Sequence, residues 1–260
     1  MELPNNEIHL YFSFPGQISD PELLEQYKSL LTDDELTRMS RLYYARHRHE
    51  YLITRALIRT SLSKYFEVEP ADWRFGKNGY GKPEISFPDK PWPIRFNLSH
   101  CNGLIMCGMA RDDDIGVDVE DAQRSTRAAF DSLSSYFSNE EIADMSGLPP
   151  DQQKQRFFDY WTLKEARVKA SGEALALALN SSSFELSFPV SGGIGAIATR
   201  ASDSATTVQY LLWDLPAGFR LAVCRISDLA LPPCLRLLEL REEGVAAEFE
   251  ASLRGTSIQH

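Results

Sequence analysis

Two acidic side chains, Asp118 and Glu120, stand two residues apart in a segment that alternates apolar with small or charged residues from 115 to 120. Such alternation predicts a strand whose branched residues face a core, while Gly116, Asp118 and Glu120 share the opposite face. Paired carboxylates suit Mg²⁺, and a cation between them would relieve their repulsion. The glycine beside them is expected to leave room for a ligand. The alternative is an ordinary half-exposed strand that follows the acidic turn 112–114.

A second group of candidate residues recurs every four positions in the segment WTLKEARVKASG, residues 161–172. On a helix, Trp161, Glu165 and Lys169 share one face, and the tryptophan indicates that this face is covered. Glu165 would add a third carboxylate, Lys169 could meet a phosphate, and Gly172 is placed to end the helix. The alternative is a solvated Glu–Lys pair, worth roughly a few tenths of a kcal/mol.

These segments and two further motifs resemble the signature of the Sfp-type 4′-phosphopantetheinyl transferases. In chain order the motifs are GKP at 81–83, FNLSH at 96–100, GVDVE at 116–120 and WTLKEARVKASG at 161–172. All four in this order are a more specific signal than either of the last two alone, and the resemblance extends from about Leu31 to Ile226. The chain departs from the family at Ala174 and Ala178, where a second glycine and a proline are common. Recognition of the carrier or the pantetheine arm by that loop is therefore not carried over.

The resemblance implies an activity and a metal site. Family members transfer the 4′-phosphopantetheine group from coenzyme A to the acceptor serine of an apo acyl or peptidyl carrier protein, with Mg²⁺, and release 3′,5′-ADP. At the matching positions, Asp118, Glu120 and Glu165 would hold Mg²⁺ against the pyrophosphate of coenzyme A. Lys169 would contact the phosphate and steady the charge that develops there. The expected partners are therefore carrier-protein domains.

The resemblance also implies a site for the rest of coenzyme A. Ser99 and His100 match a Ser-His pair that lines this site, with His100 near the 3′-phosphate. Arg55, Lys77 and Lys82 match basic positions used for the nucleotide phosphates. Two alternatives stay open: His100 could be a hydrogen-bonded structural residue at a strand end, and Arg55 could lie at the solvent edge of its helix.

The general base for the carrier serine has two candidates. Glu165 could act directly or through a water molecule, as carboxylates do in general base catalysis. Glu141 matches a family glutamate in the pattern Phe-Ser-x-x-Glu, but it is also the last residue of the capping box Ser138-Asn139-Glu140-Glu141, which favours a structural role.

Two rival functions share part of this pattern. A Mg²⁺-dependent hydrolase or nucleotidyl transferase would use the same carboxylates, but it would not explain the Ser99-His100 pair or Lys169. An inactive relative that binds coenzyme A or a carrier as a regulatory subunit would not need to retain the three carboxylates together with Lys169.

The elements that must position these residues follow the same order twice. Capping boxes at 32–35 and 138–141 each begin a helix, and a longer helix follows each of them, over 47–66 and 155–171. Strand-like segments come next, at 84–87, 94–98 and 104–110 and then at 183–188, 207–213 and 219–226, the last two joined by a turn at Pro216-Ala217-Gly218. The repeat predicts an α+β protein of two similar tandem subdomains with pseudo-twofold symmetry and a ligand site where the halves meet. The alternative is that capping boxes are common and the likeness is accidental.

We therefore expect an N-terminal α+β subdomain over 1–112 and a C-terminal α+β subdomain with the metal motifs over 113–228. The remaining residues, 229–260, are expected to form a peripheral tail, with a helix over Leu237–Leu253. Two internal halves would let a monomer complete one site.

Composition argues against several classes of protein. The 260 residues carry a net charge of −10, which argues against a nucleic-acid partner because phosphate contacts need a basic face. The four cysteines show no CxxC pair and no regular framework, which indicates reduced thiols. The sequence has neither a signal-peptide pattern nor an apolar run of membrane-spanning length, so a cytoplasmic protein without a membrane partner is expected.

One segment reverses the overall charge. Between Arg38 and Lys64, seven basic residues stand against the single acid Glu50. In an acidic protein this local excess could face an acidic carrier helix, or it could be a solvated helix face.

Overall fold

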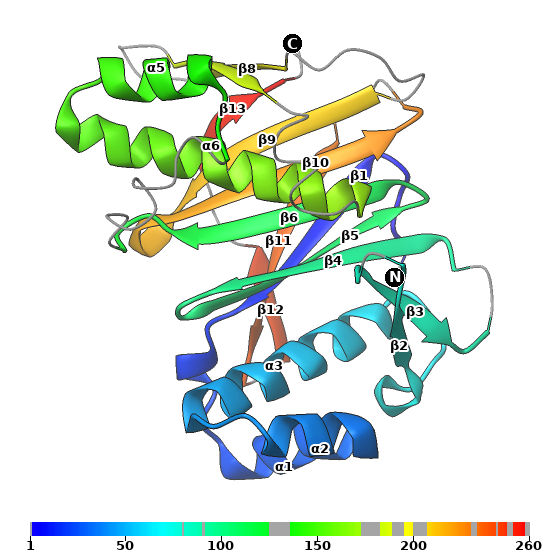
Figure 1. Ribbon diagram of the computed structural model, residues 1–260. Helices are drawn as coiled ribbons and strands as arrows, with labels where there is room; N and C mark the ends of the chain where they lie inside the picture. The colour runs from blue at the N-terminus through cyan, green and yellow to red at the C-terminus, as the bar shows by residue number, and fades with distance from the viewer. Residues whose placement is uncertain are drawn as a thin grey trace. The chain divides into compact units, whose positions relative to one another are not determined.

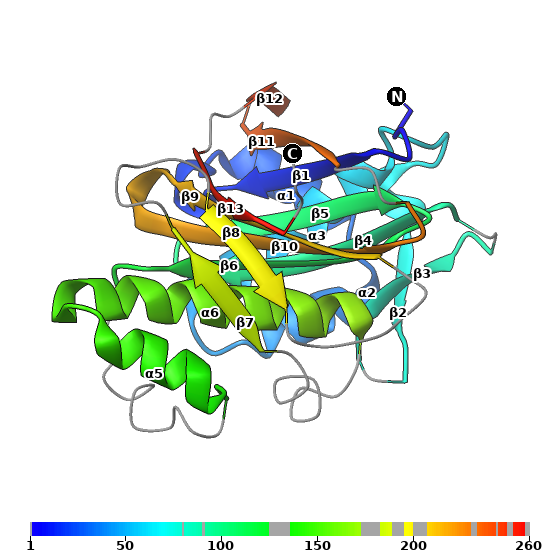
Figure 2. The same ribbon diagram turned by 90° about the horizontal axis from the view of Figure 1, so that it is seen from above.

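The computed structural model describes residues 2–79, 81–89, 92–124, 136–172, 183–188, 195–199, 207–229, 233–242, 244–248 and 252–257. The chain divides into two compact units (Figures 1 and 2). Unit 1 comprises Met1–Asp112 and Pro233–Phe249, and unit 2 comprises Asp113–Pro232 and Glu250–His260. Each unit combines helices with a sheet, so the chain has the predicted α+β fold.

Unit 1 is built on a five-stranded sheet in the order β12-β11-β1-β5-β4, with β2 and β3 forming a separate hairpin. The strand β1 pairs antiparallel with β5 and parallel with β11. In chain order the elements of unit 1 are β1 (Glu7–Ser13), η1 (Pro15–Gln17), α1 (Pro21–Ser29), α2 (Asp33–Ser40), α3 (Ala45–Leu62), η2 (Pro70–Asp72), β2 (Arg74–Lys77), β3 (Pro83–Phe87), β4 (Ile94–Cys101), β5 (Leu104–Arg111), β11 (Cys234–Arg241) and β12 (Gly244–Glu248).

The long helix α3 provides much of the core of unit 1. It packs against β1 and β5, and α1 and α2 pack against it in turn. Leu52, Ile53 and Leu57 of α3 are buried in one cluster with residues of the sheet, and burying each such side chain contributes about 1.5–3 kcal/mol. The preceding helix, α2, begins at the predicted capping box, where the Glu35 amide donates to Thr32 Oγ1 (3.2 Å) and the Thr32 amide donates to Glu35 Oε2 (3.0 Å).

Unit 2 is built on a six-stranded sheet in the order β6-β10-β9-β13-β8-β7. Its last hairpin turns at the predicted Pro216-Ala217-Gly218, where Ala217 and Gly218 both have positive φ. In chain order the elements of unit 2 are β6 (Asp114–Asp121), α5 (Asn139–Gly147), α6 (Pro150–Ser171), β7 (Phe184–Ser187), β8 (Gly195–Thr199), β9 (Thr207–Leu215), η4 (Pro216–Gly218), β10 (Phe219–Ser227) and β13 (Ser252–Thr256).

The long helix α6 runs along β6 and β10 and packs against both strands (Figure 1). Its residues Phe157, Phe158, Leu163 and Ala166 belong to the buried core of unit 2. The helix ends at Gly172, whose φ of 66° is left-handed and therefore favours glycine, as the sequence predicts.

The two units share an order of elements. In each, a strand comes first, and a helix with a capping box and a long helix follow it. A later hairpin is formed by β4 and β5 in unit 1 and by β9 and β10 in unit 2. The first strand lies beside the last strand of the hairpin in both cases, which gives the matching orders β1-β5-β4 and β6-β10-β9. The internal repeat predicted from the sequence is therefore present in the element order.

The predicted helix over Leu237–Leu253 is wrong, because this part of the chain forms strands. β11 pairs with β1 in parallel, with Leu10 opposite Leu237, and Leu237, Leu238 and Leu240 are buried. This pairing covers an edge of β1 whose backbone groups would otherwise lack partners. Further on, β13 joins β8 and β9 of unit 2.

None of the helices in the described part of the chain has the length and apolar character needed to cross a lipid bilayer.

Candidate active site

The strand β6 has the predicted alternation. Ile115, Val117 and Val119 are at most 1% exposed, while Asp118 and Glu120 lie on the opposite face, toward α6. Gly116 shares that face, but the prediction that it leaves room for a ligand is wrong. A Cβ atom there would lie 2.0 Å from the carbonyl oxygen of Ala166 and 2.4 Å from the amide nitrogen of Ala170. The missing side chain instead lets the backbone of α6 approach the strand closely.

This close approach brings Lys169 onto Asp118. Lys169 Nζ donates to Asp118 Oδ1 over 2.6 Å, joining the helix to the strand. Asp118 is only 4% exposed, whereas the Lys169 side chain keeps 26% of its surface in solvent. The Lys169 ammonium group is therefore already in contact with solvent. It can move from Asp118 to another anion without being fully desolvated.

Glu120 is held at both carboxylate oxygens. Trp161 Nε1 donates to Glu120 Oε1 (2.8 Å), and Arg124 Nη2 lies 3.1 Å from Glu120 Oε2. Burial raises the pKa of Glu120 to about 7, and the negative charge of Asp118 adds to this shift. Trp161 itself is stacked on Phe157 of the same helix, with ring planes 9° apart. Because β6 packs against α6 and Glu120 accepts from Trp161, the predicted cover on this helix face is present.

Glu165 lies one helical turn before Lys169 on α6 and is partly buried. Burial and then the charge of Asp118 raise the pKa of the Glu165 carboxyl group, while Lys169 opposes the shift. Both Glu120 and Glu165 are thus electrostatically disfavoured as anions, and Asp118 is a cause of each shift.

The donor set fits a divalent cation in its chemistry. Three carboxylates on facing elements supply hard oxygen atoms, and a cation would relieve the repulsion that raises the pKa values of Glu120 and Glu165. Among the residues that the structure describes, no three His, Cys, Asp or Glu side chains gather closely enough to hold a metal ion as they stand. The fit is therefore one of donor type and placement, and the side chains would have to turn toward the ion.

Glu141 has a complete set of structural contacts. Its Oε2 accepts from the Ser138 amide (2.8 Å) and pairs with Lys164 Nζ (3.0 Å), while its Oε1 accepts from the Phe184 amide (2.9 Å). Both side chains of the Glu141–Lys164 pair are at most 1% exposed. These contacts favour the capping role over the role of general base, because a base needs an oxygen that the substrate can reach.

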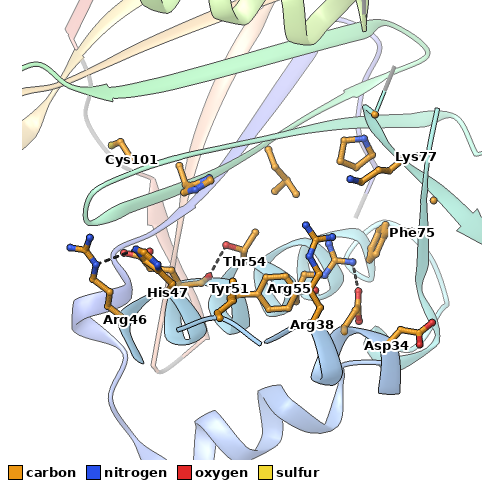
Figure 3. Close-up of a pocket in the computed structure, with 18 of the residues that line it drawn as sticks. Asp34, Arg38, Arg46, His47, Tyr51, Thr54, Arg55, Phe75, Lys77 and Cys101 are labelled. Carbon is orange, nitrogen blue, oxygen red and sulfur yellow. Dashed lines mark hydrogen bonds and ion pairs between the residues drawn. The ribbon is translucent and has the colours of Figure 1, made fainter. Parts of the chain in front are cut away.

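Unit 1 contains a cavity of about 880 Å³ beside α2, α3 and the β2–β3 hairpin. Figure 3 shows residues of α2 and α3 on one side of it and Phe75 and Lys77 of β2 on another. Of the predicted coenzyme A residues, Arg55, Lys77 and His100 line the cavity, whereas Lys82 and Ser99 do not, although Gly81 and Pro83 on either side of Lys82 do. The basic residues Arg38, Arg46 and His47 also line it.

Sequence reasoning placed Arg38 and Arg46 in a basic segment that could face an acidic carrier or be a solvated helix face, and it gave no site role to His47 or Tyr51. A signal was available: His47, Tyr51, Thr54 and Arg55 recur at helical spacing, so they share one face of α3. Arg124 was also missed, although it lies four residues after Glu120.

Arg55 does not lie at the solvent edge of its helix, since its side chain is only 15% exposed. The Arg55 guanidinium group pairs with Glu35 and lies over the ring of Phe75. Glu35 also pairs with the buried Arg59 over 2.5 Å. Burial alone would raise the pKa of Glu35, but the charge of Arg55, the Thr32 amide and Arg59 lower it below its usual value. Arg55 is thus part of the cavity wall, and it shares the single carboxylate of Glu35 with Arg59, so the three side chains keep a net positive charge.

The predicted residues therefore form two sets, a carboxylate and lysine set in unit 2 and a basic set around the cavity of unit 1. The expectation that one ligand joins them stays a prediction. Ala174 and Ala178 lie outside the described residues.

Comparisons with known proteins place the chain in one family. Residues 114–224 match the 4′-phosphopantetheinyl transferase superfamily, and residues 19–110 match the family described as 4′-phosphopantetheinyl transferase, N-terminal. The chain is 33% identical over 177 residues to the 4′-phosphopantetheinyl transferase HetI of Nostoc sp., covering 68% of this chain and 73% of that protein. It is 27% identical over 200 residues to the 4′-phosphopantetheinyl transferase Sfp of Bacillus subtilis, covering 77% of this chain and 84% of that protein.

A solved structure of a holo-(acyl-carrier-protein) synthase from Bacillus anthracis, in complex with CoA (3′,5′-ADP), aligns with 45% of this chain and 96% of that chain. The two chains superpose with a TM-score of 0.37 and are 15% identical. The sequence relatives show the family, since the match to HetI extends over 73% of that protein at 33% identity. The chain is an enzyme of the Sfp-type 4′-phosphopantetheinyl transferase family.

Proposed function

We propose that this enzyme transfers the 4′-phosphopantetheine group of coenzyme A to the acceptor serine of an apo acyl or peptidyl carrier protein, with Mg²⁺, and releases 3′,5′-ADP. The observation that supports the proposal most directly is the arrangement on β6 and α6. Asp118 pairs with Lys169, and the charge of Asp118 also acts on Glu120 and Glu165. Three carboxylates on facing elements beside a partly exposed lysine are suited to a diphosphate and its counter-ion.

Asp118, Glu120 and Glu165 would hold the metal. When bound, Mg²⁺ would supply a Lewis acid that neutralises charge on the diphosphate oxygens as the phosphorus–oxygen bond to the leaving group breaks. Trp161 contributes by fixing one oxygen of Glu120 through its indole N–H. This contact limits the rotation that Glu120 can make and so keeps its carboxylate on the face shared with Asp118.

Lys169 would move from Asp118 to an oxygen of the diphosphate. Its partly exposed side chain permits this exchange, and the attraction would strengthen as negative charge gathers on the leaving 3′,5′-ADP. One fixed donor at a position of developing charge is typically worth about 3–4 kcal/mol of activation free energy.

Glu165 would accept the proton of the carrier serine as its oxygen attacks the β-phosphorus. It would act directly or through a water molecule, as carboxylates do in general base catalysis. Glu141 is the weaker candidate because Lys164 and two backbone amides engage its oxygens.

The cavity of unit 1 would take the nucleotide end of coenzyme A. Arg38, Arg46, Lys77 and His100 supply positive or hydrogen-bonding groups for the 3′-phosphate, and the ring of Tyr51 could cover part of the adenine. Arg55 shares the Glu35 carboxylate with Arg59, so the three side chains keep a net positive charge that would also favour a phosphate.

The reaction can be tested by incubating the enzyme with coenzyme A, Mg²⁺ and a panel of apo-carriers, followed by intact mass of each carrier. We expect one phosphopantetheine group added to the acceptor serine of at least one carrier, and no addition when a chelator removes the metal. Breakdown of coenzyme A without any carrier modification would instead favour a Mg²⁺-dependent hydrolase.

A further inference from the structure

Arg124 contacts a proposed metal ligand although it belongs to none of the motifs that mark the site. Its guanidinium Nη2 lies 3.1 Å from Glu120 Oε2, on the carboxylate oxygen that Trp161 leaves open. The carbon at the centre of the guanidinium group is 5.5 Å from the centroid of the Phe158 ring. Together with Lys169 on Asp118, Arg124 places a second protein cation on the carboxylates.

The turn after β6 is built in a way that directs Arg124 back toward the strand. The Arg124 amide donates to the Asp121 carbonyl (3.1 Å), and the Gln123 amide donates to Asp121 Oδ1 (2.9 Å). Two other elements hold the same turn: Gly218 accepts from the Ala122 amide, and Lys154 of α6 donates to the Gln123 carbonyl (2.7 Å). The backbone at Arg124 is thus anchored, while its side chain is 49% exposed and can turn away from Glu120.

An exposed ion pair of this kind is weak, about 0–1 kcal/mol, so it cannot block a divalent cation that needs the same oxygen. It can still set the affinity, because the cation must displace the guanidinium group or bind close to its positive charge. Arg124 and the metal ion would compete for Glu120, whereas Lys169 occupies Asp118.

The formal charges indicate what the competition achieves. Three carboxylates, Lys169 and Arg124 together carry a net charge of −1, and one divalent cation would change this to +1. The diphosphate diester of coenzyme A, with two negative charges, would restore −1. With Arg124 present, a metal ion alone therefore leaves an excess of positive charge that the diphosphate removes.

We propose that Arg124 is an exchangeable counter-ion of Glu120 that weakens metal binding to the free enzyme and thereby couples metal binding to the arrival of the diphosphate. The inference rests on the proposed function, because it takes the carboxylates as the metal site. Arg124 is a positioning residue here, because it acts on the metal ion only through Glu120. Its charge makes metal binding depend on whether coenzyme A is bound.

The test measures Mn²⁺ binding to the full chain by electron paramagnetic resonance of the free ion, with and without coenzyme A. Arg124→Gln removes the charge, Arg124→Lys keeps it, and Lys154→Gln is a matched control. The control removes one positive charge beside the same turn, from a group that donates to the Gln123 carbonyl.

We expect Arg124→Gln to tighten Mn²⁺ binding without coenzyme A by about three- to tenfold and to reduce the factor by which coenzyme A improves it. Arg124→Lys and Lys154→Gln should stay close to the wild-type protein. An unchanged Mn²⁺ affinity in Arg124→Gln, or an equal change in Lys154→Gln, would overturn the role of Arg124 alone. A wild-type protein that takes up no Mn²⁺ under either condition would overturn the proposed metal site, and the inference with it.

Discussion

The strands β1 and β6 occupy the same place in their units but carry different chemistry. On β1, His9 Nε2 lies 2.8 Å from Glu7 and His9 Nδ1 lies 2.5 Å from the Tyr65 hydroxyl group, which also hydrogen-bonds to Tyr11 (2.7 Å). The polar groups on this strand satisfy one another. On β6, Asp118 and Glu120 are two carboxylates whose charges disfavour each other, even with Lys169, Arg124 and Trp161 in contact.

The difference shows how one framework can support two roles. Both strands lie beside a hairpin strand and pack against a long helix, so the architecture alone does not decide where chemistry occurs. In unit 1 charged side chains gather at the cavity instead, where the single carboxylate of Glu35 pairs with both Arg55 and Arg59 and a net positive charge remains. In unit 2 they lie on the strand itself, with more negative than positive charge.

The largest expected effect comes from Asp118→Ala. This change removes the carboxylate that faces Lys169 and both other acidic side chains, so carrier modification should fall by about 10³-fold or more. Stability should change little, because Lys169 can turn into solvent. A kcat/KM of Asp118→Ala near the wild-type value would contradict the assignment of the chemistry to β6. Tyr65→Phe on the corresponding face of unit 1 is the control, and it should cost about 1 kcal/mol of stability without slowing transfer.

Glu141→Gln should mainly affect folding. Lys164 would keep a buried charge without a carboxylate partner, and breaking such a pair costs about 3–5 kcal/mol of the free energy of unfolding, which urea titration measures. Glu35→Gln in unit 1 should behave similarly, because it leaves the buried Arg59 without its carboxylate. A Glu141→Gln protein with normal stability and no transferase activity would instead identify Glu141 as the general base.

Lys169→Ala should reduce kcat by about 10²–10³-fold while KM for coenzyme A changes much less, because the lysine is proposed to act on charge that develops during transfer. Steady-state kinetics with one carrier would measure both parameters. A rise in KM with unchanged kcat would make Lys169 a binding residue.

In the metal-free protein, Glu120 of unit 2 and His9 of unit 1 should make stability depend on pH in opposite directions. The pKa of Glu120 is raised from 4.5 to about 7, so its contribution to stability is present below pH 4.5 and is lost as the pH rises toward 7, by up to about 3 kcal/mol. Burial lowers the pKa of His9 from 6.5, so its contribution is present above pH 6.5 and is lost as the pH falls below it. Urea unfolding of Glu120→Gln and His9→Gln against the wild-type protein measures each slope. Slopes of the same sign would refute the distinction between the two strands.

The smallest expected effect concerns the basic segment of unit 1. Arg46 is exposed at the rim of the cavity, whereas Arg48 donates to the carbonyl groups of Leu42 and Tyr43 and so fixes the turn before α3. Arg46→Ala should weaken binding of coenzyme A or an acidic carrier severalfold and reduce its salt dependence. Arg48→Ala should change stability more than salt dependence, and equal salt dependence in the two variants would indicate a solvated face.

Features that depend on neighbouring residues could be predicted from the sequence. The capping boxes, the two long helices, the alternation of β6 and the turn at Pro216 are encoded within a few positions, and each was found close to its observed place. Gly172 as the end of α6 belongs with them.

Features that depend on distant pairing could not be predicted. The leucine spacing after Leu237 resembles a helix, and only the free edge of β1, more than two hundred residues earlier, makes it a strand. The sequence suggested that Gly116 leaves space for a ligand. Its closeness to Ala166 is a tertiary contact, which the residues around Gly116 do not reveal. The pairing of Glu141 with Lys164 was hidden for the same reason.

The central claim is that Glu165, from the helix, joins Asp118 and Glu120, from the strand, in one metal site that performs transfer. The most direct test is an intact-mass time course of an apo-carrier with coenzyme A and Mg²⁺, using the wild-type enzyme and Glu165→Gln side by side. We predict that the wild-type enzyme converts the carrier to its phosphopantetheinylated form, while a folded Glu165→Gln enzyme leaves it unmodified on the same timescale. Conversion by Glu165→Gln at the wild-type rate would contradict the claim.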